Sequence, residues 1–245
     1  MAAIIEIEHL HRDFEVGGET VHALRDVSFS ISQGEFVSIM GTSGSGKSTL
    51  LNLLGCLDTP TSGRYRIDGM DVQTMEDDSL ADVRNRKIGF VFQSYNLLPR
   101  TTALENVELP LVYNRKVSVR ERRERAEKAL RMVGLESRMR HTSAQLSGGQ
   151  QQRVAIARAI VNDPVLILAD EATGNLDTRT SYEIMTLFQE LHAQGKTIAF
   201  VTHEPDIAAF TTRTIRLRDG RVVDDSPVVP ASAQAMLESL GPVQQ

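Results

Sequence analysis

Two different patterns of apolar positions alternate along this chain. In the first 40 residues the apolar positions recur with a period of two, most clearly at 27–31. This period predicts half-buried β-strands, and the pair Gly17-Gly18 predicts a turn between two of them. Short, continuous apolar runs predict strands that are buried on both faces. These runs lie at 35–40, 88–92, 165–169 and 197–201.

Between the second and third of these runs the chain becomes charged and helical in pattern. Ser118 and Glu121 have the spacing of a capping box at a helix start, and Gly134 is the residue type that most often ends a helix. A further helix is predicted at 180–192. We therefore predict an α/β fold with a mixed, largely parallel sheet, an N-terminal antiparallel β subdomain and a helical subdomain inserted at about 95–162.

These elements predict one domain over 1–225 and a C-terminal tail over 226–245. Within the tail, apolar residues at Ala233, Met236, Leu237 and Leu240 have helical spacing, with proline before them and glycine after them. The tail therefore predicts a short helix at 230–240, docked on the chain itself or on its partner.

Composition narrows the classes of function. The 27 basic and 32 acidic residues leave a formal net charge of −5, which is a poor basis for binding nucleic acid. The basic run at 120–128 contains three glutamates, so it predicts a solvated helix face. The single cysteine, Cys56, cannot form an internal disulfide and is predicted to pack in the core. No apolar run approaches the length of a membrane span, and the N-terminus lacks the apolar segment of a signal peptide.

A glycine-rich loop carries the first chemical signal. The segment Gly41–Ser48 has the pattern G-x-x-x-x-G-K-S, and it follows a predicted strand and precedes a predicted helix. Glycines allow the backbone N–H groups to surround phosphate oxygens, and the helix N-terminus adds donors. This context predicts a P-loop core that binds a nucleoside triphosphate. The residues assigned to the nucleotide here are Gly41, Thr42, Ser43, Gly44, Ser45, Gly46, Lys47, Ser48 and Thr49.

A second signal lies at the end of the apolar run 165–169. Two carboxylates, Asp170 and Glu171, follow it directly, where ligands bind in open α/β sheets. Alone, this pair could equally be a structural cap. Together with the phosphate loop, it predicts that Asp170 and the Ser48 hydroxyl hold Mg²⁺ and that Glu171 polarises the attacking water.

A third signal identifies the family. The segment Leu146-Ser-Gly-Gly-Gln150 precedes a predicted helix, which makes a second helix N-terminus suited to an anion. The chain resembles the ATP-binding subunit of an ATP-binding-cassette (ABC) transporter over about residues 3–225, with the family motifs in order. Segments outside the core motifs are most similar to the macrolide-exporter type, within a group that includes lipoprotein-release and cell-division ATPases.

The resemblance implies further roles. Phe14 stands where the family stacks an aromatic on adenine, and Gln93 where it places a glutamine that contacts Mg²⁺ and responds to the membrane partner. His203 matches the histidine that hydrogen-bonds the γ-phosphate. A lone histidine is more often a packing or capping residue, but the position of His203 at a strand end, 32 residues after Glu171, favours the γ-phosphate role. Residues implied to meet the ATP of a second copy are Ser147, Gly148, Gly149, Gln150 and Asp177.

The resemblance also implies how the protein works. It implies an Mg²⁺-dependent ATPase that dimerises around two ATP molecules, binds no nucleic acid and drives a separate membrane permease at the cytoplasmic face of the cell membrane. Export or mechanotransmission of a hydrophobic or peptide substrate is the expected work. Two alternatives remain open: a cell-division-type ATPase that regulates a cell-wall hydrolase, and a soluble ABC ATPase outside transport.

Overall fold

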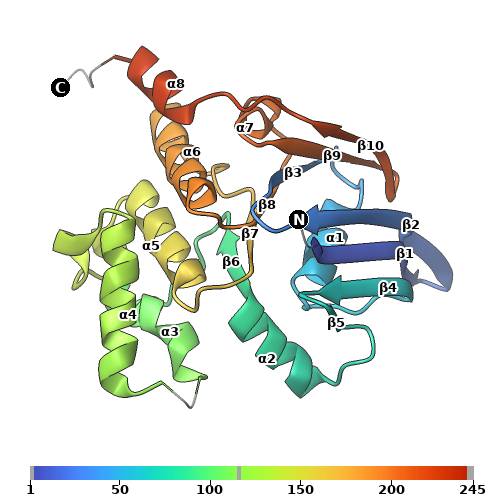
Figure 1. The fold of residues 1–245 in the computed structure, drawn as a ribbon, viewed down its shortest axis with the longest axis horizontal. Helices are drawn as coiled ribbons and strands as arrows, with labels where there is room; N and C mark the ends of the chain where they lie inside the picture. Colours follow the sequence, from blue (N-terminus) through green and yellow to red (C-terminus); the bar gives the residue numbers. More distant parts are fainter. Residues whose placement is uncertain (1–2, 115–116, 242–245) are drawn as a thin grey trace.

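The computed structural model describes residues 3–114 and 117–241. The predicted domain, helical insertion and tail each include positions outside the described residues: 1–2, 115–116 and 242–245 respectively. Three parts can be followed in Figure 1: an antiparallel sheet, a central sheet and a group of helices on the opposite side of the molecule.

The N-terminal part is a four-stranded antiparallel sheet with strand order β2-β1-β4-β5. Burial alternates along the second half of β2, where Val27, Phe29 and Ile31 are buried and the serines between them are exposed, as the period of two predicts. Register shifts interrupt the pairing of β1 with β2, and the far end of this hairpin is exposed. The strands are β1 Ala3–Val16, β2 Glu19–Ser32, β4 Ser62–Ile67 and β5 Met70–Asp71.

The central sheet has six strands in the order β10-β9-β3-β8-β7-β6. All neighbours from β9 to β6 pair in parallel, and β10 pairs with β9 in antiparallel orientation. The sheet is therefore mixed and largely parallel, as the apolar runs predict. The strands are β3 Phe36–Met40, β6 Ile88–Phe92, β7 Leu166–Asp170, β8 Ile198–Thr202, β9 Arg213–Arg218 and β10 Arg221–Pro227.

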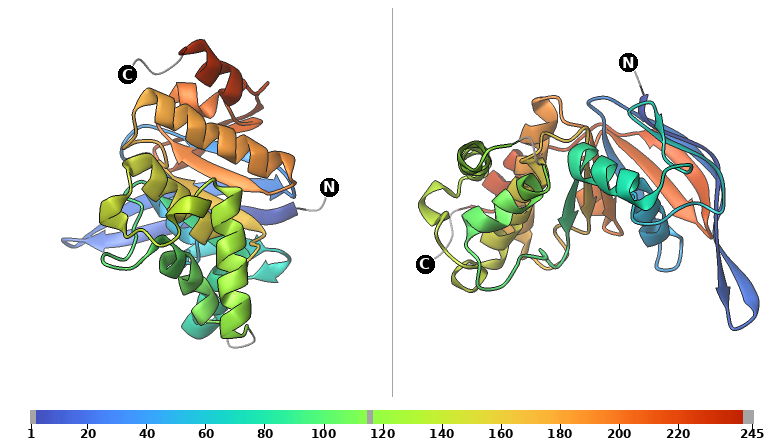
Figure 2. Two further views of the ribbon diagram at one scale, coloured as in Figure 1. Left: turned by 90° about the vertical axis from the view of Figure 1, so that its left-hand side faces the viewer. Right: turned by 90° about the horizontal axis from the view of Figure 1, so that it is seen from below.

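Alternate residues of the central strands pack into two separate cores. Along β7, Leu166 and Leu168 join the core shared with the antiparallel sheet, whereas Ile167 and Ala169 join the core shared with the helices. The views in Figure 2 follow these layers from two sides. The helices are α1 Lys47–Leu54, α2 Asp77–Lys87, α3 Ala103–Val112, α4 Val119–Met132, α5 Gly148–Ile160, α6 Thr178–Ala193, α7 Pro205–Ala208 and α8 Ala233–Ser239, with 3-10 turns at Glu136–Arg138 and Ser143–Gln145.

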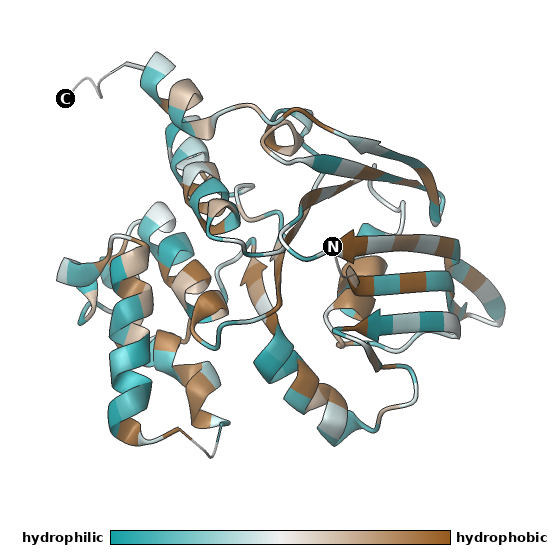
Figure 3. Cartoon of the chain, viewed as in Figure 1, coloured by the Kyte–Doolittle hydropathy of each residue, from teal (hydrophilic) through white to brown (hydrophobic). Residues whose placement is uncertain are grey.

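Helix α4 has the solvated face that its mixed charges predict. Arg120, Arg123 and Arg125 each pair with a glutamate four positions away, and Figure 3 shows the helix as largely hydrophilic. The N-cap differs in detail from the predicted capping box. Ser118 accepts a hydrogen bond from the Glu121 backbone N–H, but the Glu121 carboxylate pairs with Arg125 instead of returning to the cap.

The C-terminal helix α8 is shorter than predicted and packs against α6 (Figure 1). The Gln189 amide of α6 donates to the carbonyl oxygens of Phe210 and Ala231 and accepts from the Ala233 N–H. Ala233 is fully buried, whereas Met236 is 42% exposed. The predicted apolar stripe of this helix is therefore only partly covered: its first turn is held by the buried Ala233 and by Gln189, whereas Met236 faces solvent.

Candidate functional site

The glycine-rich loop leaves β3 and enters α1 in a conformation that requires glycine. Gly44 and Gly46 have φ values of +78° and +100°, in the left-handed region that side chains disfavour. A Cβ on Gly46 would also lie 2.7 Å from the Ala23 carbonyl oxygen of β2. The loop therefore packs directly against β2 of the antiparallel sheet, with no room for a side chain at Gly46.

The loop presents donors at the start of α1. In the described residues no side chain caps this helix, so its first N–H groups are available to an anion. The Lys47 ammonium donates to the carbonyl oxygens of Gly41 and Thr42, at 2.7 and 2.9 Å, which holds this cation over the loop. Together these donors form a site suited to a chain of phosphates.

Strand order explains how distant sequence motifs meet. The loop follows β3, His203 follows β8, Asp170 and Glu171 lie at the end of β7, and Gln93 follows β6. These four strands are adjacent and parallel, so their carboxyl ends meet at one edge of the sheet. All of these residues line a single cavity of about 1040 Å³, together with Gly41, Thr42, Ser43, Gly44, Gly46, Lys47, Ser48 and Thr49.

Ser45 is the member of the predicted loop that turns inward. Its side chain is buried, and its hydroxyl has no hydrogen-bond partner in the part of the chain that the structure describes. A Cβ on Gly41 would lie 2.4 Å from this hydroxyl oxygen. Ser45 therefore fills the base of the loop, and its carbonyl accepts a hydrogen bond from the Gly220 N–H.

The carboxylates in the cavity have different environments. Burial raises the pKa of Asp170, the negative charge of Glu171 raises it further, and Lys47 opposes both effects. The Glu171 carboxylate lies 2.7 Å from Nδ1 of His203, and the Glu171 backbone N–H donates to the carbonyl of Val201. Glu171 has a φ of +44°, so its side chain is held in an uncommon backbone conformation beside the cavity. An oriented carboxylate in this position is able to accept a proton from water.

The cavity also contains a donor set that fits a divalent cation. The Ser48 hydroxyl, the Gln93 amide and the Asp170 carboxylate line it, and hard oxygen ligands of this kind suit Mg²⁺. Among the described residues, three or more His, Cys, Asp or Glu side chains nowhere come together in a group that could hold a metal ion. The set is typical of a metal whose ligands come partly from the protein and partly from substrate phosphates.

The predicted second anion site lies on a different surface. Ser147 caps α5 through a complete capping box with Gln150, and Asp177 caps α6 by accepting from Thr180. The Thr180 hydroxyl also lowers the pKa of Asp177. A Cβ on Gly149 would lie 2.4 Å from the Thr180 methyl group, so the two helix N-termini are packed together. The described residues that line the cavity do not include Ser147, Gly148, Gly149, Gln150 or Asp177.

Phe14 lies beside the cavity rather than in its lining. Its partner on β2 is Val21, which does line the cavity, and antiparallel partners share one face of a sheet. Three further lining residues, His22, Arg216 and Arg218, were not predicted from the sequence. Each is an exposed polar side chain on a strand and belongs to no recognisable motif, so only the fold reveals that they surround the phosphate loop.

Comparison with known proteins gives the family. A model of the ABC transporter family matches residues 24–174. An ABC transporter ATP-binding protein of Bacillus subtilis, YknY, is 55% identical over 91% of this chain and 96% of its own length. The macrolide export ATP-binding/permease protein MacB of Chlorobaculum tepidum is 54% identical over 91% of this chain. The match spans about a third (34%) of that MacB.

Solved structures agree with this assignment. The ATP-binding cassette MJ0796, in a dimeric post-hydrolysis state bound to ADP and Pi, superposes with a TM-score of 0.84 and 48% identity over 93% of this chain and 100% of its own. The cassette cbiO1 of Clostridium perfringens has a TM-score of 0.82 at 30% identity. The predicted fold class and the predicted ATPase activity are thereby confirmed. The chain belongs to the ABC transporter family, and it is an ATP-binding subunit that hydrolyses ATP.

Proposed function

We propose that this ATPase works as a dimer in which each ATP is held between two copies of the chain. The observation that carries this proposal is the separation of the two predicted anion sites: the loop Gly41–Ser48, apart from the buried Ser45, lines the cavity, whereas Ser147–Gln150 lies outside it. The capping box of α5 satisfies the N–H groups of Ser147 and Gln150, and the remaining N–H groups of the first turn are suited to an anion bound by another chain. The related cassette MJ0796 is dimeric in its solved structures, one of them bound to ADP and Pi, which supports a dimer here.

Within this dimer the cavity residues have distinct roles. Lys47 and the loop amides bind the β- and γ-phosphates, Glu171 polarises the attacking water, and His203 hydrogen-bonds the γ-phosphate. Phe14 stacks on adenine. Ser48, Gln93 and Asp170 hold Mg²⁺, which neutralises phosphate charge when it is bound. The second copy contributes Ser147, Gly148, Gly149, Gln150 and Asp177.

A split active site predicts a dependence of activity on protein concentration. Well below the dimer dissociation constant, the ATPase rate per chain should rise in proportion to protein concentration, because each complete site needs two chains. Steady-state phosphate release at saturating ATP and Mg²⁺, over a hundredfold range of protein, measures this. A rate per chain that stays constant while size exclusion shows only monomers would contradict the two-chain site.

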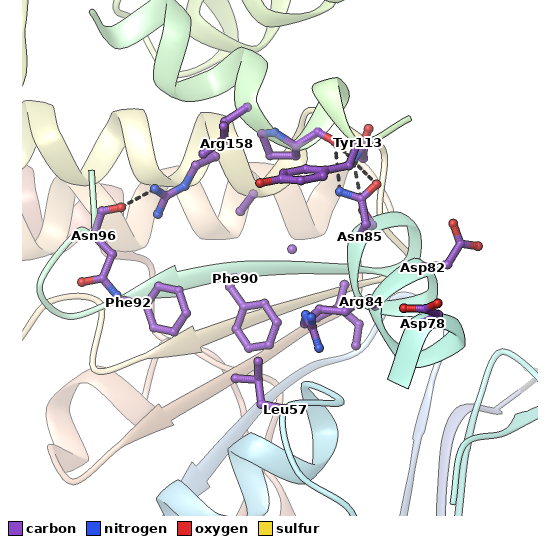
Figure 4. A pocket seen from close by; sticks show the side chains of 17 residues that line it. Leu57, Asp78, Asp82, Arg84, Asn85, Phe90, Phe92, Asn96, Tyr113 and Arg158 are labelled. Carbon is purple, nitrogen blue, oxygen red and sulfur yellow. Dashed lines mark hydrogen bonds between the residues drawn. The ribbon is translucent and has the colours of Figure 1, made fainter. Parts of the chain in front are cut away.

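We also propose that the membrane partner docks in a second cavity, of about 860 Å³, between β6, α2, α3 and α5 (Figure 4). The Phe90 and Phe92 rings stack at its floor, with centroids 5.4 Å apart, and Leu57 and Tyr113 stand at its edges. Both edge side chains are exposed. Exposed apolar side chains that surround a groove are typical of a protein-binding site.

The charges of this cavity favour a partner segment that carries both signs. Asp78 and Asp82 of α2 lie on one side, and Arg158 of α5 lies on another (Figure 4). Burial lowers the pKa of Arg158, whose guanidinium donates to the carbonyls of Tyr95 and Asn96. Within the described ranges no carboxylate pairs with it. An acidic residue of the partner would supply the missing counter-charge.

This docking site is testable with membranes of the source organism. Inverted membrane vesicles, stripped of peripheral proteins, should retain the wild-type chain on sedimentation and retain Tyr113→Glu about tenfold less, because a tyrosine that becomes buried on docking is a typical interface anchor. Val119→Glu is the matched control, since Tyr113 and Val119 are both 73% exposed but Val119 lies outside the cavity. Equal retention of Tyr113→Glu and wild type would contradict this site.

Attachment to a permease would place the protein at the cytoplasmic face of the cell membrane. In the described residues no helix is long and apolar enough to cross a membrane. Similarity to MacB, a macrolide export ATP-binding/permease protein, supports export or mechanotransmission of a hydrophobic or peptide substrate as the work that ATP hydrolysis drives.

A further inference from the structure

One face of the Phe14 ring is covered by an arginine of the same strand. The guanidinium carbon of Arg12 lies 4.5 Å from the ring centroid, within the range of a cation–π contact. The Phe14 side chain still remains 37% exposed. A ring covered by a cation on one side offers its other side for stacking.

Arg12 is itself fixed in place by a carboxylate from a different part of the fold. Its Nε and Nη2 donate to the two carboxylate oxygens of Asp58, both at 2.8 Å, in a bidentate pair. Both side chains are about three-quarters buried, with exposed fractions of 23% and 24%. Asp58 also accepts a hydrogen bond from the Thr59 N–H, which restricts its rotamer.

The Arg12–Asp58 pair connects the Phe14 ring to the segment that follows helix α1, the helix that begins at the phosphate loop. Asp58 follows the C-terminal end of α1, and the N-terminal end of the same helix begins at Lys47 of the loop. Phe14 pairs across the strands with Val21, which lines the nucleotide cavity. The chain of contacts Phe14–Arg12–Asp58 therefore fixes the ring relative to the helix on which the phosphates rest.

We propose that Arg12 is a positioning residue for the nucleotide base: locked by Asp58, it backs Phe14 so that the ring presents its free face to adenine. The inference rests on the proposed stacking of adenine on Phe14. A preorganised ring loses little rotamer freedom when the base binds, so removing its support should weaken binding of the base while contacts to the phosphates are unchanged.

The test compares two ligands that share phosphates but differ in the base. Isothermal titration with ATP, in EDTA so that no hydrolysis occurs, should give a dissociation constant about three- to tenfold higher for Arg12→Ala than for wild type. Inorganic tripolyphosphate should bind both proteins equally. Arg12→Lys keeps the positive charge but loses the bidentate pair, so its dissociation constant for ATP should lie between those of the wild type and Arg12→Ala. Thermal unfolding shows whether each variant is folded.

A double-mutant cycle tests whether Arg12 affects ATP affinity through the Phe14 ring. In the Phe14→Ala background, Arg12→Ala should cause no further loss of ATP affinity, because the ring through which it acts is absent. Arg64→Ala removes an arginine from β4 of the same sheet and should leave ATP affinity unchanged; Arg64 pairs with Glu8 and Asp71 instead.

Two results would overturn the proposal in distinguishable ways. If Phe14→Ala weakens ATP binding but Arg12→Ala does not, or if Arg12→Ala weakens it equally with and without Phe14, Arg12 does not position the ring. If Phe14→Ala leaves ATP affinity unchanged, the proposed placement of adenine fails, and the role of Arg12 fails with it.

Discussion

Glu171→Gln should lower ATP hydrolysis by about 10²–10⁴-fold, the range typical of losing a general base. The Glu171 carboxylate lies at the end of β7, 2.7 Å from Nδ1 of His203, so a base is held at the edge of the cavity. Glutamine keeps the shape and the capacity to accept a hydrogen bond but cannot take a proton from water. Phosphate release at saturating ATP and Mg²⁺ measures the loss, and Glu190→Gln, on the exposed side of α6, should leave the rate unchanged.

The same variant should trap the assembled state. Binding depends on Lys47, Ser48 and the loop amides rather than on Glu171, and glutamine removes a negative charge beside the γ-phosphate. ATP should therefore stay bound and hold two copies together on size exclusion. Adding Ser147→Arg should abolish that dimer, because the larger side chain blocks the N-terminus of α5, while ATP binding to each chain survives.

Two outcomes would contradict the proposed sandwich. One is a Glu171→Gln variant that remains monomeric at saturating ATP and Mg²⁺. The other is a dimer that persists after Ser147→Arg is added. Either result would place hydrolysis within a single chain, with the surface around Ser147 and Asp177 serving another purpose.

Lys47→Ala should weaken ATP binding by about 10- to 100-fold, because a hydrogen bond to a charged group contributes about 1.5–3 kcal/mol. The Lys47 ammonium is held over the loop by the carbonyls of Gly41 and Thr42, so it is already placed where phosphates would bind. Titration with ATP measures the affinity, and thermal unfolding checks that the loop variant remains folded.

Lys128→Ala provides a control for this effect. Lys128 is an exposed lysine of α4, and its removal changes the net charge by the same amount as removal of Lys47. Its ATP affinity should equal that of the wild type. If both lysine variants bind ATP as the wild type does, the Lys47 ammonium does not contact the phosphates.

The sequence brings most of the cavity residues into view because they directly follow strands that are easy to recognise. Continuous apolar runs mark β3, β6, β7 and β8, and each motif begins where a run ends. Parallel pairing then brings the motifs together without any long-range information beyond strand order. Arg216, Arg218 and His22 could not be found in this way, since their side chains are exposed and follow no motif, and their approach to the loop depends on how two sheets meet.

Helix α2 was missed for a different reason. Leu80 and Val83 are its only buried residues within the described part of the chain, too few to produce a helical pattern of apolar positions. Its charges did contain a signal, with Asp77 and Asp78 in the first turn and basic residues in the last, as the helix dipole favours. The Phe14–Arg12–Asp58 chain was also beyond prediction, because 46 residues separate Arg12 from Asp58.

The contact between Gly149 and Thr180 has a consequence for how the molecule changes shape. Helices α5 and α6 approach so closely at this point that no β-carbon fits between them. Sliding or tilting one helix against the other would create a clash or a void, and packed interiors resist both. We therefore expect a displacement of the start of α5 to move the cap of α6 with it, so that Ser147 and Asp177 change position together.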